Sequence, residues 1–246
     1  TNILLTGANG FVGKALLAKL LDCDDYKVNA ALRVENDFNH CAVSIVGDFN
    51  KNTNWSNAVE KQAIVIHTAA HTNITKNEVF DPADMYRIVN VDGTLNLARQ
   101  AADAGVKRFI FISSIKVNGE ETSIFRPFTA EDSPIPVDSY GISKLEAENG
   151  LMKIAYNTGM QVVIIRPPLV YGPGVKGNFA NLVNLIKKGI PLPLGGIQNR
   201  RSLIALDNLV DLIMTCINHH AAGNQILLAG DGQDLSTTEL LRGIAS

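Results

Sequence analysis

The stretch Asn2-Ile3-Leu4-Leu5-Thr6-Gly7-Ala8-Asn9-Gly10-Phe11-Val12-Gly13 decides the fold of this chain. Its first five residues are mostly apolar, as in a buried strand, and the apolar residues from Ala15 to Leu21 recur at helical spacing. Of the three glycines between these patterns, the first permits a tight turn, the second lets a diphosphate approach the backbone, and the third lets helix and strand pack closely. The stretch therefore predicts a dinucleotide-binding strand, turn and helix.

The composition is that of a globular enzyme-sized chain. Of 246 residues, 46% are apolar, enough to fill one large α/β domain or a domain with a smaller lobe. A formal net charge of −2 provides no basic surface for nucleic acid, and no apolar stretch approaches the length of a membrane span. Cys23, Cys41 and Cys216 are scattered, so neither disulfides nor a metal site are expected, and a cytoplasmic location is the default.

Beyond the first helix, strand and helix patterns continue to alternate. Strands are expected at 27–32, 42–46, 63–67, 108–113 and 161–166, and helices at 11–21, 82–104 and 139–158. This order predicts an α/β fold with a Rossmann-type doubly wound parallel sheet in residues 1–166. Residues 167–246 are richer in loops, with helices expected at 178–188, 206–218 and 237–244, and are predicted to form mostly a smaller substrate-binding lobe.

Tyr140 and Lys144 are four residues apart on the helix expected at 139–158, so their side chains share one helix face. An ammonium group beside a phenol favours the phenolate, which predicts a lowered pKa for Tyr140. Alone, such a pair is also typical of a solvated helix face. Beside a dinucleotide-binding turn, it predicts a tyrosine that transfers protons.

At this point six ordered motifs resemble those of the extended short-chain dehydrogenase/reductases, in particular the nucleotide-sugar epimerase/dehydratase branch. Each motif alone is weak, but their order over nearly the whole chain is specific. They are Thr6-Gly7-x-x-Gly10-x-x-Gly13, Val65-Ile66-His67-Thr68-Ala69-Ala70, Asn90-Val91-x-Gly93-Thr94, Phe111-Ile112-Ser113-Ser114, Tyr140-x-x-x-Lys144 and Arg166-Pro167-Pro168-x-Val170-Tyr171-Gly172-Pro173.

The resemblance implies a catalytic group of Ser114, Tyr140 and Lys144. The serine holds the reacting sugar oxygen, the tyrosine moves the proton, and the lysine binds the nicotinamide ribose. Ser113 is then a structural strand-end residue, with a shared role as the alternative. Cofactor contacts are implied for Gly7, Asn9, Gly10, Phe11, Val12, Gly13, Arg33, Asp48, Thr68, Ala69, Ala70, Tyr140, Lys144, Pro167 and Leu169.

The same resemblance implies roles for several other polar residues. His67 is expected to be structural, and Asn90 to brace the strand that carries the catalytic serine. Substrate contacts are assigned to His71, Lys116, Asn178 and Arg201, with Arg200 as the alternative to Arg201.

The identity of the cofactor is left between NAD and NADP. Arg33 follows the strand at 27–32, where an acidic residue would bind the ribose 2′-OH of NAD. A cation there accommodates a 2′-phosphate, which leans toward NADP, whereas Glu35 and an epimerase function favour NAD.

Three functions are compatible with these motifs. A nucleotide-sugar 4-epimerase acting on a UDP-hexose is favoured. The alternative is an NADPH-dependent 4-keto-sugar-nucleotide reductase of surface-polysaccharide synthesis, supported by Arg33 and by Lys116 and Asn118, which depart from the epimerase pattern. The third is a non-catalytic NAD(P)-binding scaffold or redox sensor.

A 4,6-dehydratase is disfavoured, because Ile115-Lys116 replaces the Asp-Glu pair of relatives with that activity. Relatives also commonly dimerise through helices corresponding to 82–104 and 139–158, and continue several dozen residues past the position of Ser246. A homodimer and an incomplete C-terminal lobe are therefore expected.

Overall fold

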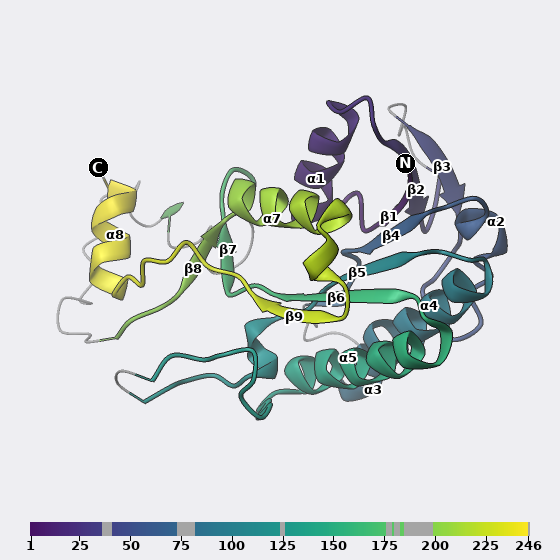
Figure 1. Ribbon diagram of the computed structural model, residues 1–246. Helices are drawn as coiled ribbons and strands as arrows, with labels where there is room; N and C mark the ends of the chain where they lie inside the picture. Colours follow the sequence, from purple (N-terminus) through teal and green to yellow (C-terminus); the bar gives the residue numbers. More distant parts are fainter. Residues whose placement is uncertain are drawn as a thin grey trace.

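A parallel β-sheet forms the centre of the molecule (Figure 1). The computed structural model describes residues 1–35, 41–72, 82–123, 126–175, 179, 183–184 and 199–245. In spatial order the seven strands are β3 (Ala42–Ile45), β2 (Lys27–Leu32), β1 (Asn2–Thr6), β4 (Ile64–His67), β5 (Arg108–Ile112), β6 (Gln161–Arg166) and β9 (Gln225–Leu228). Each neighbouring pair is parallel. The predicted Rossmann-type sheet is confirmed.

Helices cover both faces of this sheet, as a doubly wound fold requires (Figure 1). On one face lie α1 (Phe11–Leu21) and α7 (Leu206–Asn218), which bury Leu16 and Ile213 in a common core. On the other lie α4 (Thr94–Asp103) and α5 (Ser139–Thr158), which bury Leu97 and Leu151. The short helix α2 (Ser56–Val59) contributes Ala58 to the second core.

The helix predicted at 82–104 is interrupted by a π-helical segment. It consists of α3 (Pro82–Tyr86), the π-helix η1 (Arg87–Gly93) and α4. Within η1 the buried side chain of Asn90 exchanges hydrogen bonds with the backbone of His71, and its amide also donates to Ser143 Oγ at 3.1 Å. Segments of π-helix often mark functional sites, and this one lies beside the segment that follows β4.

The region after β6 contributes to two sheets: a small separate one and the main one. β7 (Leu169–Tyr171) pairs with β8 (Leu203–Ala205) in a separate parallel sheet, and α8 (Thr237–Ala245) follows near the end of the chain. In contrast, α7, the 3₁₀ helix η3 (His220–Ala222) and β9 return to the main sheet. The sequence does not predict β9, because four residues are too few for a clear alternating pattern. The helix expected at 178–188 falls mostly outside the described residues.

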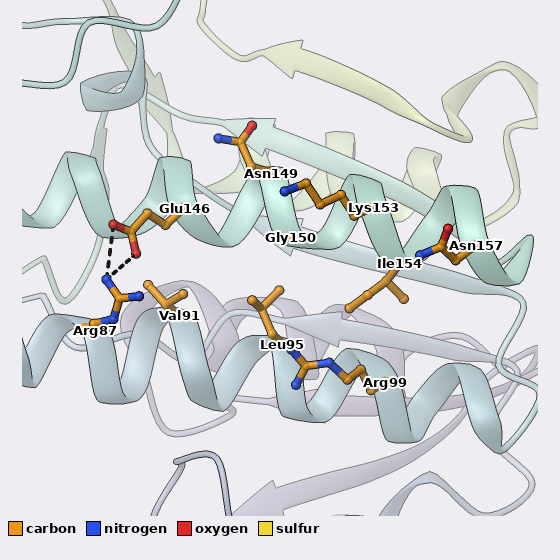
Figure 2. Close-up of a pocket in the computed structure, with 10 residues that line it drawn as sticks. All are labelled: Arg87, Val91, Leu95, Arg99, Glu146, Asn149, Gly150, Lys153, Ile154 and Asn157. Carbon is orange, nitrogen blue, oxygen red and sulfur yellow. Dashed lines mark hydrogen bonds and ion pairs between the residues drawn. The ribbon is translucent and has the colours of Figure 1, made fainter.

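A long groove runs between the helices on the second face of the sheet (Figure 2). Its volume is about 510 Å³, and its walls come from η1 and α4 on one side and α5 on the other. The two helices approach closely because Gly150 has no side chain: a Cβ there would lie 2.5 Å from Leu95 Cδ2. An ion pair between Arg87 and Glu146, 3.1 Å long, closes one end of the groove.

Arg108 attaches the C-terminal end of α7 to the sheet. Its Nη1 donates to the carbonyl oxygens of Cys216, Ile217 and His219 at 2.7 to 3.1 Å, and its Nη2 donates to Gln161 Oε1 at 2.6 Å. The guanidinium therefore satisfies carbonyls that a helix end leaves without partners, and its charge suits the negative end of the helix dipole.

We expect Arg108→Met to destabilise the fold by on the order of 3 kcal/mol, because buried helix carbonyls lose their donor. The measurement is the urea midpoint of unfolding, with the exposed Arg242 on α8 changed to Met as the matched control. Equal midpoints for the two variants would contradict this account of Arg108.

Candidate active site

The candidate active site lies at the carboxyl edge of the sheet, where the strand order reverses. From β1 the chain moves outward through β2 to β3, and then returns to β4 on the other side of β1. The segments that follow β1 and β4 therefore flank one crevice, which is where ligands bind in open α/β sheets. Gly7 and Thr68 to Ala70 follow these two strands, so the structure brings together two of the predicted cofactor segments.

The glycine turn is built for close backbone contacts. Gly7 has φ +72°, and a Cβ there would lie 2.6 Å from both Ala69 N and Thr68 Oγ1. A Cβ on Gly13 would lie 2.0 Å from the carbonyl oxygen of Gly7. Gly10 N donates to Gly7 O at 2.8 Å and caps α1. The turn thus presents the first-turn amides of α1 in the crevice, and these residues fit a dinucleotide diphosphate.

Other predicted cofactor residues lie at the carboxyl ends of further strands of the same sheet. Arg33 follows β2 and Asp48 follows β3, and both side chains are exposed. Pro167 and Leu169 follow β6, and the Pro167 carbonyl accepts from Ile115 N at 3.0 Å, next to Ser114. Asn9, Phe11 and Val12 lie in the glycine turn and the first turn of α1.

Helix α5 carries Tyr140 in its first turn and Lys144 one turn later, as predicted. Asp138 is the N-cap, and its Oδ1 accepts from Gly141 N at 2.7 Å. Lys144 is buried, with its Nζ 4.1 Å from the centroid of the Phe111 ring, a cation–π geometry. Burial lowers the pKa of Lys144 to about 7, although the charge of Glu148 opposes the shift.

The expected lowering of the Tyr140 pKa by Lys144 is wrong for this structure. Burial raises the pKa of Tyr140, and the neighbouring Tyr86 and Asp138 raise it further. The rings of Tyr86 and Tyr140 meet edge to face, with centroids 5.8 Å apart. Sharing a helix face does not place an ammonium against a phenol, because Lys144 extends over Phe111. Tyr140 is therefore held as a neutral phenol at neutral pH.

His67 is structural, as expected. It is buried between two threonine hydroxyls, with Nδ1 2.7 Å from Thr6 Oγ1 and Nε2 2.9 Å from Thr94 Oγ1. Burial lowers its pKa to about 3, and the charge of Lys144 adds to the effect. The imidazole is therefore neutral and joins β1, β4 and α4 below the crevice.

The two serines after β5 have different surroundings. Ser113 is buried, and its hydroxyl donates to Glu148 Oε1 at 2.5 Å, which fits a structural residue. Ser114 is half-buried and caps the 3₁₀ helix η2 (Ile115–Val117), where its Oγ accepts from Lys116 N at 3.3 Å. Ser114 is therefore the more exposed of the two serines.

A buried ion pair supports this strand end. Arg166 and Glu148 are each 2% exposed, with Nε 3.0 Å from Oε1 and Nη2 2.5 Å from Oε2. Arg166 Nη1 also donates to Asn118 Oδ1 at 2.9 Å, and Asn118 Nδ2 donates to Thr129 O at 2.9 Å. The network joins β5, β6, α5 and the loop after η2.

The predicted substrate residues lie in different elements and have different contacts. The Lys116 ammonium bonds Asp138 Oδ2 and lies 3.8 Å from Glu120. The backbone amide of His71 is fixed by Asn90, and its ring lies 5.6 Å from that of Tyr86. Arg201 is exposed and forms an antiparallel bridge with Leu235. Asn178 lies outside the described residues.

Asn90 has a different task from the one the resemblance implies. It does not bond the serine-bearing strand; it ties the His71 segment to Ser143 on α5. Sequence reasoning also missed Glu148 and Asp138, and it identified Asn118 only as a departure from the epimerase pattern. A detectable signal was present, since an arginine at the end of the apolar strand Gln161–Arg166 requires a buried partner.

The fold and these residues together define the class of the protein. The chain belongs to the NAD dependent epimerase/dehydratase family, whose sequence profile matches residues 3–230. It is therefore an enzyme of that family, as predicted.

The chain is also similar to individual proteins. The chain is 51% identical over 245 residues to a UDP-glucose 4-epimerase of Vibrio cholerae, a match that covers 99% of this chain and 75% of that protein. It is 30% identical to an N-acetyl-alpha-D-glucosaminyl-diphospho-ditrans,octacis-undecaprenol 4-epimerase of Escherichia coli O157:H7, covering 98% and 70%. A solved UDP-glucuronic acid 4-epimerase from Bacillus cereus in complex with NAD shares the fold, with a TM-score of 0.86, 22% identity, and coverage of 99% and 83%.

Within the described part of the chain, no His, Cys, Asp and Glu side chains group as a metal site would require. Over the same residues, no helix combines the length and apolar character needed to span a bilayer.

The glycine turn provides a test of the crevice geometry. Gly7 and Gly105 both have left-handed backbones, at φ +72° and +83°, but a Cβ on Gly105 meets nothing within 4 Å. We expect Gly105→Ala to cost about 1 to 2 kcal/mol of unfolding free energy from the backbone conformation alone. Gly7→Ala should cost about 1 to 3 kcal/mol more, because its Cβ also collides with Thr68 and Ala69. Equal losses in urea unfolding would contradict the crowding described above.

Proposed function

We propose that this protein is a UDP-hexose 4-epimerase that uses NAD. The main support is the 51% identity to the Vibrio cholerae enzyme over nearly the whole chain. The site supports the proposal independently, because Ser114, Tyr140 and Lys144 follow the strand and begin the helix next to the dinucleotide crevice.

We propose NAD as the cofactor rather than NADP, toward which Arg33 alone leans. The family description specifies NAD, and the Bacillus cereus neighbour was solved with NAD. The residues that would hold the cofactor are the glycine turn, the Thr68–Ala70 segment and Lys144. When bound, the nicotinamide supplies the group that accepts and returns a hydride.

The residues of the chain supply binding and proton transfer. In the proposed mechanism, Ser114 Oγ hydrogen-bonds the sugar 4-oxygen. The Tyr140 phenol first loses its own proton to solvent; as phenolate it then takes the proton of the 4-hydroxyl, and it returns that proton when the 4-keto oxygen is reduced. Lys144 fixes the nicotinamide ribose, and its pKa of about 7 gives it access to both charge states near neutral pH. Tyr86 packs edge to face on Tyr140 and holds the phenol ring in position.

The reductase alternative loses part of its support in the structure. Arg33 favours it, and so do Lys116 and Asn118, which depart from the epimerase pattern. Both residues have structural partners: Asn118 links Arg166 to the loop at Thr129, and Lys116 pairs with Asp138. These contacts explain the departures without a change in reaction.

The division of the chain is also proposed. Residues 1–166 bind the cofactor and carry the catalytic group, and residues 167–246 mostly bind substrate. The proposed substrate contacts are Asn178 and Arg201 in the second part and His71 in the first. The segment from α7 to β9 belongs to the main sheet, so the substrate lobe is the part around β7, β8 and α8. We place the protein in the cytoplasm, where nucleotide sugars are available.

The proposal predicts turnover without added cofactor. Protein denatured after purification should release NAD, and the native protein should interconvert UDP-glucose and UDP-galactose. Tyr140→Phe should lower kcat by about 10² or more, the usual contribution of general acid–base catalysis, and retain bound NAD. Tyr26→Phe removes the same atom from a hydroxyl that accepts from Asn218, far from the site in the fold, and should retain activity. Strict dependence on added NADPH would instead support the reductase.

We further propose a homodimer through the groove between η1, α4 and α5. The groove runs between two helices that point the same way (Figure 2), and α5 exposes two large side chains close to the residues that line it. Ile142 is 43% exposed and Tyr156 is 89% exposed. A second copy packing on this face would cover both.

Sedimentation velocity tests the dimer. Tyr156→Glu should shift the protein toward monomer without loss of fold, because the side chain is almost fully exposed in one chain. Leu21→Glu, on α1 at the opposite face of the sheet, is the matched control and should remain dimeric. A monomeric wild-type protein at micromolar concentration would refute the proposed dimer.

A further inference from the structure

Lys116 connects the two segments that carry the catalytic hydroxyls. Its ammonium bonds Asp138 Oδ2 at the start of α5, and its backbone amide bonds Ser114 Oγ at 3.3 Å. Asp138 in turn caps α5 through Gly141 N at 2.7 Å, one residue beyond Tyr140. One lysine therefore contacts the Ser114 segment directly and the Tyr140 segment through the helix cap.

The backbones of η2 and α5 also meet closely at this point. A Cβ on Gly141 would lie 2.9 Å from the Lys116 carbonyl oxygen and 3.2 Å from Asp138 Oδ1. The backbone of η2 at Lys116 is therefore packed directly against the first turn of α5. The ion pair is only partly exposed, with 44% and 37% of the two side chains accessible.

The Asp138 carboxylate of this pair acts on the phenol. Asp138 is among the groups that raise the pKa of Tyr140, after burial and Tyr86. Burial also works to raise the pKa of Asp138, but bonds from Lys116 and the Gly141 amide outweigh it and lower that pKa. The carboxylate is therefore ionised at neutral pH, and the ammonium of Lys116 is the cation that balances it.

Other titratable groups lie on the elements packed around Tyr140. On α3, Tyr86 contacts the phenol and Asp84 is exposed, and the ring of His71 packs on Tyr86. Further along α5 and beneath it lie four groups: Lys144 over Phe111, Glu148 paired with Arg166, Glu146 paired with Arg87, and the neutral His67. After η2, Glu120 lies 3.8 Å from Lys116.

We propose that Lys116 is a positioning residue that acts on Tyr140 through Asp138, by holding the helix cap and cancelling the carboxylate charge beside the phenol. The inference rests on the proposed role of Tyr140 as the group that transfers the proton. It gives Lys116 a task other than the substrate contact implied by family resemblance.

The proposal makes opposite predictions for the two partners. In Lys116→Met the carboxylate of Asp138 is left unbalanced, so the phenol should ionise at higher pH. In Asp138→Asn the helix cap is kept, because Asn is as good an N-cap as Asp, but the carboxylate that raises the pKa of the phenol is removed. The ammonium then has Glu120 as its remaining anionic partner, 3.8 Å away, and the phenol should ionise at lower pH. In the double variant both charges are absent, and the midpoint should return to that of the wild type.

The ionisation is measured directly at one residue. Difluorotyrosine placed at position 140 ionises at lower pH than tyrosine, because fluorine withdraws electrons, and its ¹⁹F resonance follows the phenol through a pH titration. Each single variant should shift the midpoint by about half a unit or more in its own direction, and the double variant should cancel the shift. Lys116→Arg should keep the wild-type midpoint.

The matched control is Lys61→Met. Lys61 forms a comparable lysine–carboxylate pair, 3.3 Å from Glu60, but on an exposed turn before β4. It should leave the midpoint unchanged. Shifts in the same direction for Lys116→Met and Asp138→Asn, no shift in either, or a double variant that stays displaced would each overturn the proposal.

This readout does not depend on turnover. If the wild-type protein fails to interconvert UDP-glucose and UDP-galactose, the proposed function fails, whereas the ¹⁹F midpoints still decide the role of Lys116. If the protein is active, Lys116→Met should also move the pH profile of kcat in the same direction as the midpoint. A variant that only damaged the substrate site would raise KM and leave both unchanged.

Discussion

The buried pair of Arg166 and Glu148 is the interaction on which the geometry of the site depends. Two charges at 2% exposure are costly to bury, and the cost is offset only where every polar atom finds a partner. Here Glu148 accepts from both Arg166 and Ser113, and Arg166 also donates to Asn118. The pair fixes how α5 is rotated against β5 and β6. That rotation brings Lys144, one turn before Glu148, to the carboxyl edge of the sheet.

The same arrangement explains the electrostatics around the site. Lys144 is buried against Phe111, so its charged form is disfavoured, and the nearby carboxylate of Glu148 limits the loss. His67 lies close enough for its protonation to be opposed by Lys144, and two threonine hydroxyls satisfy the neutral ring. The Lys144 amine can be accommodated at this depth because it lies against an aromatic ring and near the neutral His67 and the carboxylate of Glu148.

Patterns within short stretches of sequence were sufficient to predict the elements that are determined by residues adjacent in the chain. The glycine turn, the strands from β1 to β6 and helix α5 follow from spacing and apolar runs, and the family motifs located Ser114, Tyr140 and Lys144. Contacts between distant segments were not predictable in this way. Nothing local indicates that Lys144 extends over Phe111, that Asn90 bonds His71 and Ser143, or that β9 joins the sheet beside β6.

The two residues that depart from the epimerase pattern lie close together, and both connect the segment after Ser114 to neighbouring elements. Lys116 and Asn118 lie on η2 and its cap, immediately after Ser114. One binds the N-cap of α5 and the other binds Arg166 and the loop at Thr129. An aromatic residue at position 118 could not accept from Arg166 and donate to Thr129 through one amide group. Changing either residue therefore removes a contact to a partner distant in the sequence: Asp138 for Lys116, and Arg166 and Thr129 for Asn118.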